Sequence, residues 1–163
     1  MAEVSEATQA APGARLARIV ASGAGTGYAP VAPGTFGSLL GVAIGSAVLA
    51  TGPAWLPLAI AGVILAGLWA IRAVRASDDP GWVVIDEVAG QMVALLPLSR
   101  PAPLGIAAAF LLFRMLDIAK PGPVGWFDRR QDSLGVMGDD VVAGGLAAII
   151  LWIGVRMLQL IPS

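Results

Sequence analysis

Apolar residues occur in five long stretches, separated by glycine, proline and charged residues rather than alternating with polar ones. The stretches cover residues 35–50, 54–71, 82–98, 104–119 and 139–161. The lengths of several lie near the lower limit of about 17 residues for a membrane-spanning helix, so tilted, partly re-entrant or protein-shielded helices are expected among them. The pattern predicts an all-α fold, a bundle of about four to five transmembrane or partly re-entrant helices. It leaves open whether the first stretch fully crosses.

Composition supports membrane residence. Hydrophobic residues make up 57% of the 163-residue chain, only 13% are charged, and the mean hydropathy is +0.81. An ordinary soluble domain is about 45–50% apolar. We therefore expect one membrane-embedded domain over residues 15–163. Residues 1–14 lack the basic and then apolar pattern of a secretory signal, and we expect them to form a loose tail. The only basic pair is Arg129-Arg130, so no nucleic-acid partner is expected.

The distribution of charge indicates an orientation. With five crossings and a cytoplasmic N-terminus, seven of the ten basic residues lie inside and two outside, while Arg114 lies within a helix. This bias agrees with the positive-inside rule. The same topology brings every acid except Glu3 and Glu6 to the cytoplasmic face. Arg114 and Asp117 share a helical face near that side, so a polar cluster facing the cytoplasm is expected.

The absence of cysteine and histidine narrows the chemistry. Disulfides, structural zinc sites, cysteine nucleophiles and imidazole acid–base catalysis are excluded. Clustered carboxylates repel one another unless a cation lies among them. Oxygen ligands favour magnesium, with manganese and calcium as alternatives, and Arg114 and Lys120 would add fixed positive charge. Such a site suits a phosphate. A network of salt bridges joining the helices is the structural alternative.

Two similar motifs carry most of the acids. "DEVAG" (86–90) and "DDVVAG" (139–144) each place a glycine four residues after an aspartate, Asp86 or Asp140. Small residues let a neighbouring helix approach closely, so the two acidic helix starts are predicted to face each other. The alternative is that acids at helix N-termini only favour the helix dipole.

A glycine-rich segment, residues 21–38, precedes the first stretch. We expect a helix cap near Thr35, with free backbone N–H groups at 35–38 that could bind a phosphate; a flexible connection is the alternative. The segment lacks the ending of a P-loop. Further along, Gly37, Gly41 and Gly45 form a ridge that indicates helix packing, either within the chain or in a homo-oligomer.

Four segments occur in a familiar order with similar gaps: "GTGYAPVAPGTFGS", "DPGWVVIDEVAG", "FRMLDIAKPGPVGWFDRR" and "GVMGDDVVAG". Over about residues 20–150 the chain resembles the phosphatidylglycerophosphatase A family of bacterial membrane phosphatases. The resemblance implies magnesium-dependent hydrolysis of phosphatidylglycerol phosphate to phosphatidylglycerol and inorganic phosphate, a step of phospholipid biosynthesis at the bacterial cytoplasmic (inner) membrane. One departure is Gly138, where relatives tend to have an apolar residue.

The resemblance and the residue chemistry together give a hypothesis for the site. The candidate metal ligands are Asp79, Asp86, Glu87, Asp139 and Asp140. The candidate catalytic residues are Arg114, Asp117, Lys120 and Asp140. The candidate substrate-binding residues are Thr35, Ser38, Arg114, Lys120, Asp128 and Arg129. The nucleophile stays open between a metal-bound water and an aspartate, Asp140 or Asp117.

A small ion- or proton-coupled transporter is the alternative from another functional class. Charged residues on several helices could line a pathway in such a protein. Against this interpretation, the acids lie on one side and no polar residues continue to the other.

Overall fold

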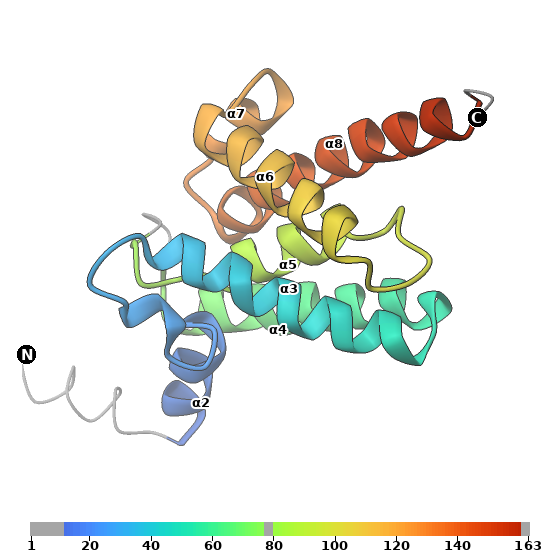
Figure 1. Cartoon of the computed structure of the whole chain (residues 1–163). Coiled ribbons are helices and arrows are strands. Elements are labelled where there is room, and N and C mark those ends of the chain that lie inside the picture. Colours follow the sequence, from blue (N-terminus) through green and yellow to red (C-terminus); the bar gives the residue numbers. More distant parts are fainter. Residues whose placement is uncertain (1–11, 77–79, 161–163) are drawn as a thin grey trace, which may run out of the picture.

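The computed structural model describes residues 12–76 and 80–160, and every regular element in these ranges is helical. The elements form one bundle (Figure 1). The helices are α2 (Pro12–Ala21), α3 (Pro33–Thr51), α4 (Leu56–Ala73), α5 (Ile85–Ala94), α6 (Pro103–Ala119), α7 (Pro123–Asp128) and α8 (Ser133–Leu160), with short 3-10 helices at Thr26–Tyr28 and Pro53–Trp55. The predicted all-α class is confirmed.

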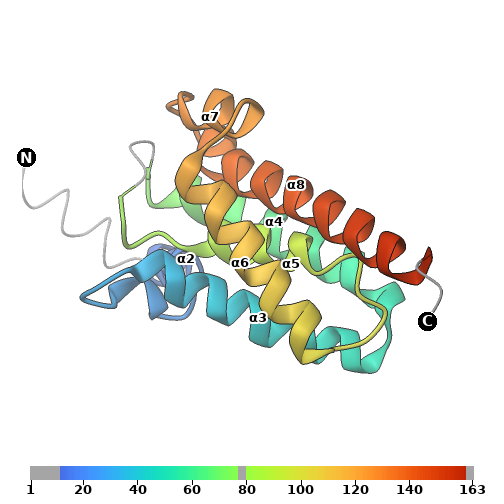
Figure 2. The same ribbon diagram turned by 45° about the horizontal axis from the view of Figure 1, so that its top comes forward.

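Helix α5 lies at the centre of the bundle, between α3, α4, α6 and α8 (Figure 2). Nine of its ten residues are buried. Ten helical residues span about 15 Å, half of the roughly 30 Å hydrocarbon layer. The stretch 82–98 is therefore one of the helices that do not fully cross: the helix covers only 85–94, and protein rather than lipid surrounds it.

In contrast to α5, three segments of the described chain are long and apolar enough to cross a membrane, judged by length and composition. They are Pro33–Thr51, Pro53–Ala73 and Ser133–Met157. The first of these contains the stretch 35–50, and its length and composition are compatible with a full crossing. Helix α6 has 17 residues, which is near the lower limit for crossing. Large apolar side chains are exposed on the outside of the bundle, among them Leu58, Leu65, Leu104, Leu111 and Ile149, as expected of surfaces that face lipid.

Glycines allow α5 to pack closely against its neighbours. A Cβ on Gly41 of α3 would lie 2.7 Å from the carbonyl oxygen of Val88, and one on Gly45 would lie 2.6 Å from Cδ1 of Leu95. The glycine ridge thus packs within the chain, while a homo-oligomer stays a prediction. On the other side, a Cβ on Gly144 of α8 would lie 2.1 Å from the carbonyl oxygen of Gly90. The two acidic motifs therefore face each other as predicted.

Several boundaries differ from those expected. Helix α8 begins at Ser133, six residues before 139, and the carboxylate of Asp132 accepts a hydrogen bond of 2.7 Å from the backbone N–H of Gly135. Asp139 and Asp140 consequently lie in its second turn and not at its start. Helix α2 begins at Pro12, inside the predicted tail 1–14; the rest of that tail lies outside the described residues. The short helix α7 was not predicted.

Candidate active site

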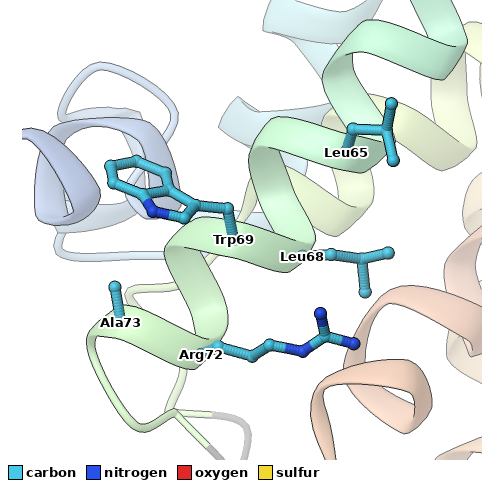
Figure 3. A pocket seen from close by; sticks show the side chains of 5 residues that line it. All are labelled: Leu65, Leu68, Trp69, Arg72 and Ala73. Atoms are coloured by element: carbon cyan, nitrogen blue, oxygen red, sulfur yellow. The ribbon is translucent and has the colours of Figure 1, made fainter.

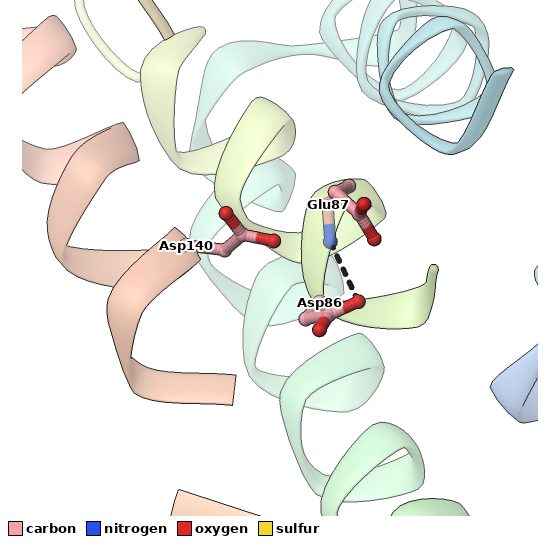
Figure 4. Close-up of side chains that lie close together, drawn as sticks. All are labelled: Asp86, Glu87 and Asp140. Atoms are coloured by element: carbon pink, nitrogen blue, oxygen red, sulfur yellow. Dashed lines mark hydrogen bonds between the residues drawn. The ribbon is translucent and has the colours of Figure 1, made fainter. Parts of the chain in front are cut away.

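Three carboxylates meet where α5 crosses α8. Asp86 and Glu87 lie in the first turn of α5, and Asp140 lies in the second turn of α8 (Figure 4). One carboxylate oxygen from each residue lies within 4.8 Å of the other two. Close packing of the two helices causes this, since a Cβ on Gly90 would lie only 2.5 Å from the carbonyl oxygen of Asp140. We call Asp86, Glu87 and Asp140 the carboxylate triad.

The triad fits a divalent cation. Asp86 and Asp140 are only 4% and 3% exposed, and buried carboxylates at such distances repel one another unless a cation or a proton neutralises them. Among the described residues, Oδ1 of Asp140 is buried without a hydrogen-bond partner. A set of oxygen donors without nitrogen or sulfur suits a hard cation. The acidic cluster could therefore bind a metal ion.

Helix α6 places an arginine and a fourth acid beside the triad. Arg114 Nη1 donates to Oδ2 of Asp117 at 2.5 Å and to Oγ of Ser38 at 3.4 Å. Ser38 is fully buried, and its hydroxyl donates to the carbonyl oxygen of Gly34 at 2.8 Å. The charge of Asp117 also acts on Asp140. Arg114 is thus held in a fixed position at the edge of the triad.

Gly34, in the first turn of α3, is a site residue that the sequence reasoning missed. A Cβ at this position would lie 2.2 Å from Oε1 of Glu87 and 3.4 Å from Nη1 of Arg114. The glycine therefore leaves the space in which these two side chains lie. The signal was present in the motif "APGTFGS", where the glycine follows a proline at a helix start.

Lys120 ends α6 in a left-handed conformation, with φ of 45°. Its Nζ donates to Oδ2 of Asp139 at 2.9 Å and to Oδ1 of Asp128. Burial by itself would lower the pKa of Lys120, but the hydrogen bonds and charges of Asp128 and Asp139 raise it above its ordinary value. Asp139, predicted as a metal ligand together with Asp140, is thus paired with Lys120 outside the triad. Adjacent helical residues point about 100° apart, which explains the division.

The other predicted residues are more scattered. Asp79 lies outside the described residues. Thr35 lies inside α3, which begins at Pro33, and its backbone N–H donates to the carbonyl of Ala32 at 2.9 Å. Contrary to the expectation, this N–H is therefore not free to bind a phosphate. Arg129 is exposed immediately after α7.

A shallow hollow of about 400 Å³ lies elsewhere, on the outer face of α4 (Figure 3). It is lined by Leu65, Leu68, Trp69, Arg72 and Ala73. Arg72 reaches across it to α8, where its Nε donates to Oγ of Ser133 at 2.9 Å. None of the candidate site residues lines this hollow, so it is separate from the triad.

The raised pKa of Lys120 predicts slow labelling by amine-reactive reagents. Lys120 is the only lysine of the chain, so peptide mapping distinguishes it from the N-terminal amine. At pH 9 a higher pKa leaves less of the reactive neutral amine, and each pKa unit lowers that fraction about tenfold. We expect Lys120 to acetylate roughly tenfold or more slowly than a free lysine. Replacement of Asp128 with Asn should speed the reaction, and an unchanged rate would contradict the ion pairing.

Comparison with known proteins gives consistent matches. A family model described as phosphatidylglycerophosphatase A matches residues 19–155. Phosphatidylglycerophosphatase A of Escherichia coli (strain K12) is 38% identical over 141 residues, covering 82% of this chain and 80% of that protein. The protein of the same name from Haemophilus influenzae is 34% identical over 139 residues, covering 82% and 85%.

A third relative carries another name. A protein of Bacteroides thetaiotaomicron named "Putative phosphatidylinositol-3-phosphatase" is 37% identical over 142 residues, covering 82% of this chain and 89% of its own length. No solved structure matches the chain.

Proposed function

The chain belongs to the phosphatidylglycerophosphatase A family, and from this premise we propose that it hydrolyses phosphatidylglycerol phosphate to phosphatidylglycerol and inorganic phosphate, with magnesium as its metal. The observation that carries the proposal is the carboxylate triad, which lies largely buried beside Arg114 at one end of an apolar bundle. The Bacteroides relative is named for another lipid phosphomonoester. Phosphatidylglycerol phosphate is favoured here because the family model and two relatives carry its name.

Asp86, Glu87 and Asp140 would hold the magnesium ion. When bound, the metal would act as a Lewis acid toward the phosphoryl group and lower the pKa of a water molecule. Arg114 would bind non-bridging oxygens of the phosphate through its guanidinium, which Asp117 and Ser38 orient. Lys120 would supply a second positive charge nearby. Together these groups neutralise the charge that develops on the transferred phosphoryl group.

We favour water over an aspartate as the nucleophile. Water attacks phosphorus and gives up a proton, the bond from phosphorus to the glycerol oxygen breaks with its electron pair going to that oxygen, and the oxygen takes up one proton in exchange, so that inorganic phosphate and the alcohol form. Asp117 is engaged by Arg114 at 2.5 Å, which weakens it as a nucleophile. Asp140 contributes to the triad instead of standing alone. An aspartyl-phosphate route through either residue is the alternative.

The membrane arrangement explains why the charges are needed at only one end of the bundle. We propose a single membrane-embedded domain over residues 15–163 in the bacterial cytoplasmic membrane, with the triad facing the cytoplasm. The excess of basic residues in the loops at the triad end supports this orientation. The acyl chains of the substrate could then stay in the bilayer while its terminal phosphate reaches the triad at headgroup depth.

The transporter alternative receives less support. A coupled transporter would be expected to carry charged groups along a path between the two faces. Within residues 12–76 and 80–160, the buried charged side chains are Asp86, Asp139 and Asp140, and all of them lie at the triad end. The far half of the described bundle offers no buried charge for a pathway.

Phosphate release from phosphatidylglycerol phosphate by the purified protein in detergent tests the proposal. We expect release with magnesium, loss of release in excess EDTA, and recovery when magnesium is restored. No membrane gradient is present in detergent, so release there would also contradict the transporter alternative. A wild-type protein that releases no phosphate, or that releases it equally in EDTA, would overturn the metal-dependent phosphatase.

A further inference from the structure

Arg129 is a basic residue whose charge is not balanced by an ion pair within the described part of the chain. The other basic residues of the segment from α6 to the start of α8 are paired: Arg114 with Asp117, Lys120 with Asp128 and Asp139, and Arg130 with Asp132. Arg129 forms no ion pair with any carboxylate of residues 12–76 or 80–160. It is exposed, so its guanidinium is accessible to a ligand.

The guanidinium of Arg129 lies next to the turn that carries Lys120. A Cβ on Gly125 of α7 would lie 3.6 Å from Nη1 of Arg129 and 2.8 Å from the carbonyl oxygen of Lys120. The side chain therefore folds back along α7, toward the residue that pairs with Asp139. Through this turn, Arg129 lies beside the proposed phosphate-binding region but outside the buried triad.

Helix α7 also has the character of a segment at headgroup depth. Trp126 is 54% exposed, and the guanidinium of Arg130 lies over its ring, 5.8 Å from the centroid. Exposed tryptophan beside arginine is typical of the membrane–water interface. Arg129 thus stands where the backbone phosphates of lipids would lie.

We propose that Arg129 binds the inner phosphodiester of the substrate while the terminal phosphomonoester lies at the triad, so that the site selects lipids with two phosphates. The inference rests on the proposed phosphatase function and adds the source of headgroup selectivity. Phosphatidylglycerol phosphate carries a monoester and a diester joined by a glycerol. Phosphatidic acid carries one monoester and no diester, so it cannot use Arg129 and the triad together. A guanidinium is well matched to phosphate oxygens.

The test compares the two lipids. We would measure kcat and KM for phosphatidylglycerol phosphate in magnesium with the wild type and with Arg129→Gln. Phosphatidic acid would be measured as a substrate or, if it is not hydrolysed, as a competitive inhibitor. We expect KM for phosphatidylglycerol phosphate to rise about tenfold in Arg129→Gln, in line with the loss of one charged hydrogen bond. The kcat value and the constant for phosphatidic acid should stay within about twofold, because neither depends on the diester contact.

Two further variants separate binding from structure. Arg130→Gln removes a neighbouring charge that is already paired with Asp132, with 2.7 Å between Nη2 and Oδ2, and should leave both lipids unaffected. Arg129→Lys keeps the charge and should restore much of the affinity. Suppose that the wild type hydrolyses phosphatidylglycerol phosphate. If Arg129→Gln then leaves the constants for both lipids unchanged, or raises both by the same factor, only this inference fails. A wild type without phosphatase activity would overturn the proposed function and this inference with it.

Discussion

Replacement of Asp140 with Asn should reduce kcat for phosphatidylglycerol phosphate about a thousandfold while the protein stays folded. Asn keeps the volume of the side chain but removes its negative charge, and with it one of the three carboxylates of the triad. Loss of one group that stabilises developing charge costs about 10²- to 10³-fold in other enzymes, and a metal ligand should lie at the upper end. Phosphate release at saturating magnesium measures the effect.

Thermal unfolding provides a second and independent readout for the same variant. A ligand that binds only the folded state raises its apparent stability, so magnesium should raise the Tm of the wild type. Asp140→Asn should lose this increase. In EDTA the variant should be at least as stable as the wild type, because one of three mutually repelling carboxylates, two of them buried, is gone.

Asp132 offers a matched control for Asp140. It is also an aspartate of the same region, but it is partly exposed, pairs with Arg130 and caps the start of α8. Asn can accept the same capping hydrogen bond, so Asp132→Asn should keep both activity and the magnesium-induced increase in Tm. Asp140→Asn with more than a tenth of wild-type activity, or an equal loss in both variants, would contradict the assignment of the triad.

The sequence was enough to predict that the acids lie close together, but not which residue each carboxylate contacts. Antiparallel helices bring every second connection to the same end, which is enough to gather Asp86, Glu87 and Asp140. Which neighbour each carboxylate contacts depends on packing that no spacing reveals. Asp139 is next to Asp140 in the chain, yet α7 and the turn at Lys120 give it a different partner.

Hydropathy also could not show what surrounds an apolar segment. Helix α5 is buried in protein, and the apolar run of residues 82–98 that contains it has the same pattern as a segment that faces lipid. The start of α8 was missed for a different reason. Gly135 and Gly138 precede the predicted start at 139, but they lie within α8 and make room for the preceding segment: a Cβ on Gly138 would lie 2.4 Å from Cδ1 of Phe127, and one on Gly135 would lie 2.3 Å from the carbonyl oxygen of Arg130.

The close contact between α5 and α8 should make the protein sensitive to Gly144→Ala. A Cβ on Gly144 would lie 2.1 Å from the carbonyl oxygen of Gly90, and backbone cannot move aside as a flexible side chain can. We expect a loss of about 2–3 kcal/mol in the free energy of unfolding, since overpacking costs about 1–3 kcal/mol or more. The higher helix propensity of alanine, worth about 1 kcal/mol, offsets only part of the strain.

The next residue is the control for this prediction. A Cβ added to Gly145 would have no neighbouring atom within 4 Å, so Gly145→Ala should be neutral or stabilise the protein by up to about 1 kcal/mol. Unfolding by denaturant in detergent measures both variants. Equal stability of the two would contradict the close crossing of α5 and α8.

Gly144→Ala also tests how the crossing serves the site. Gly144 lies one turn beyond Asp140 on α8, so separating the helices moves Asp140 away from Asp86 and Glu87 without changing any carboxylate. We expect the folded fraction of Gly144→Ala to lose most of its phosphatase activity and much of the magnesium-induced increase in Tm, while Gly145→Ala keeps both. If folded Gly144→Ala responded to magnesium like the wild type, the spacing of the triad would not determine metal binding.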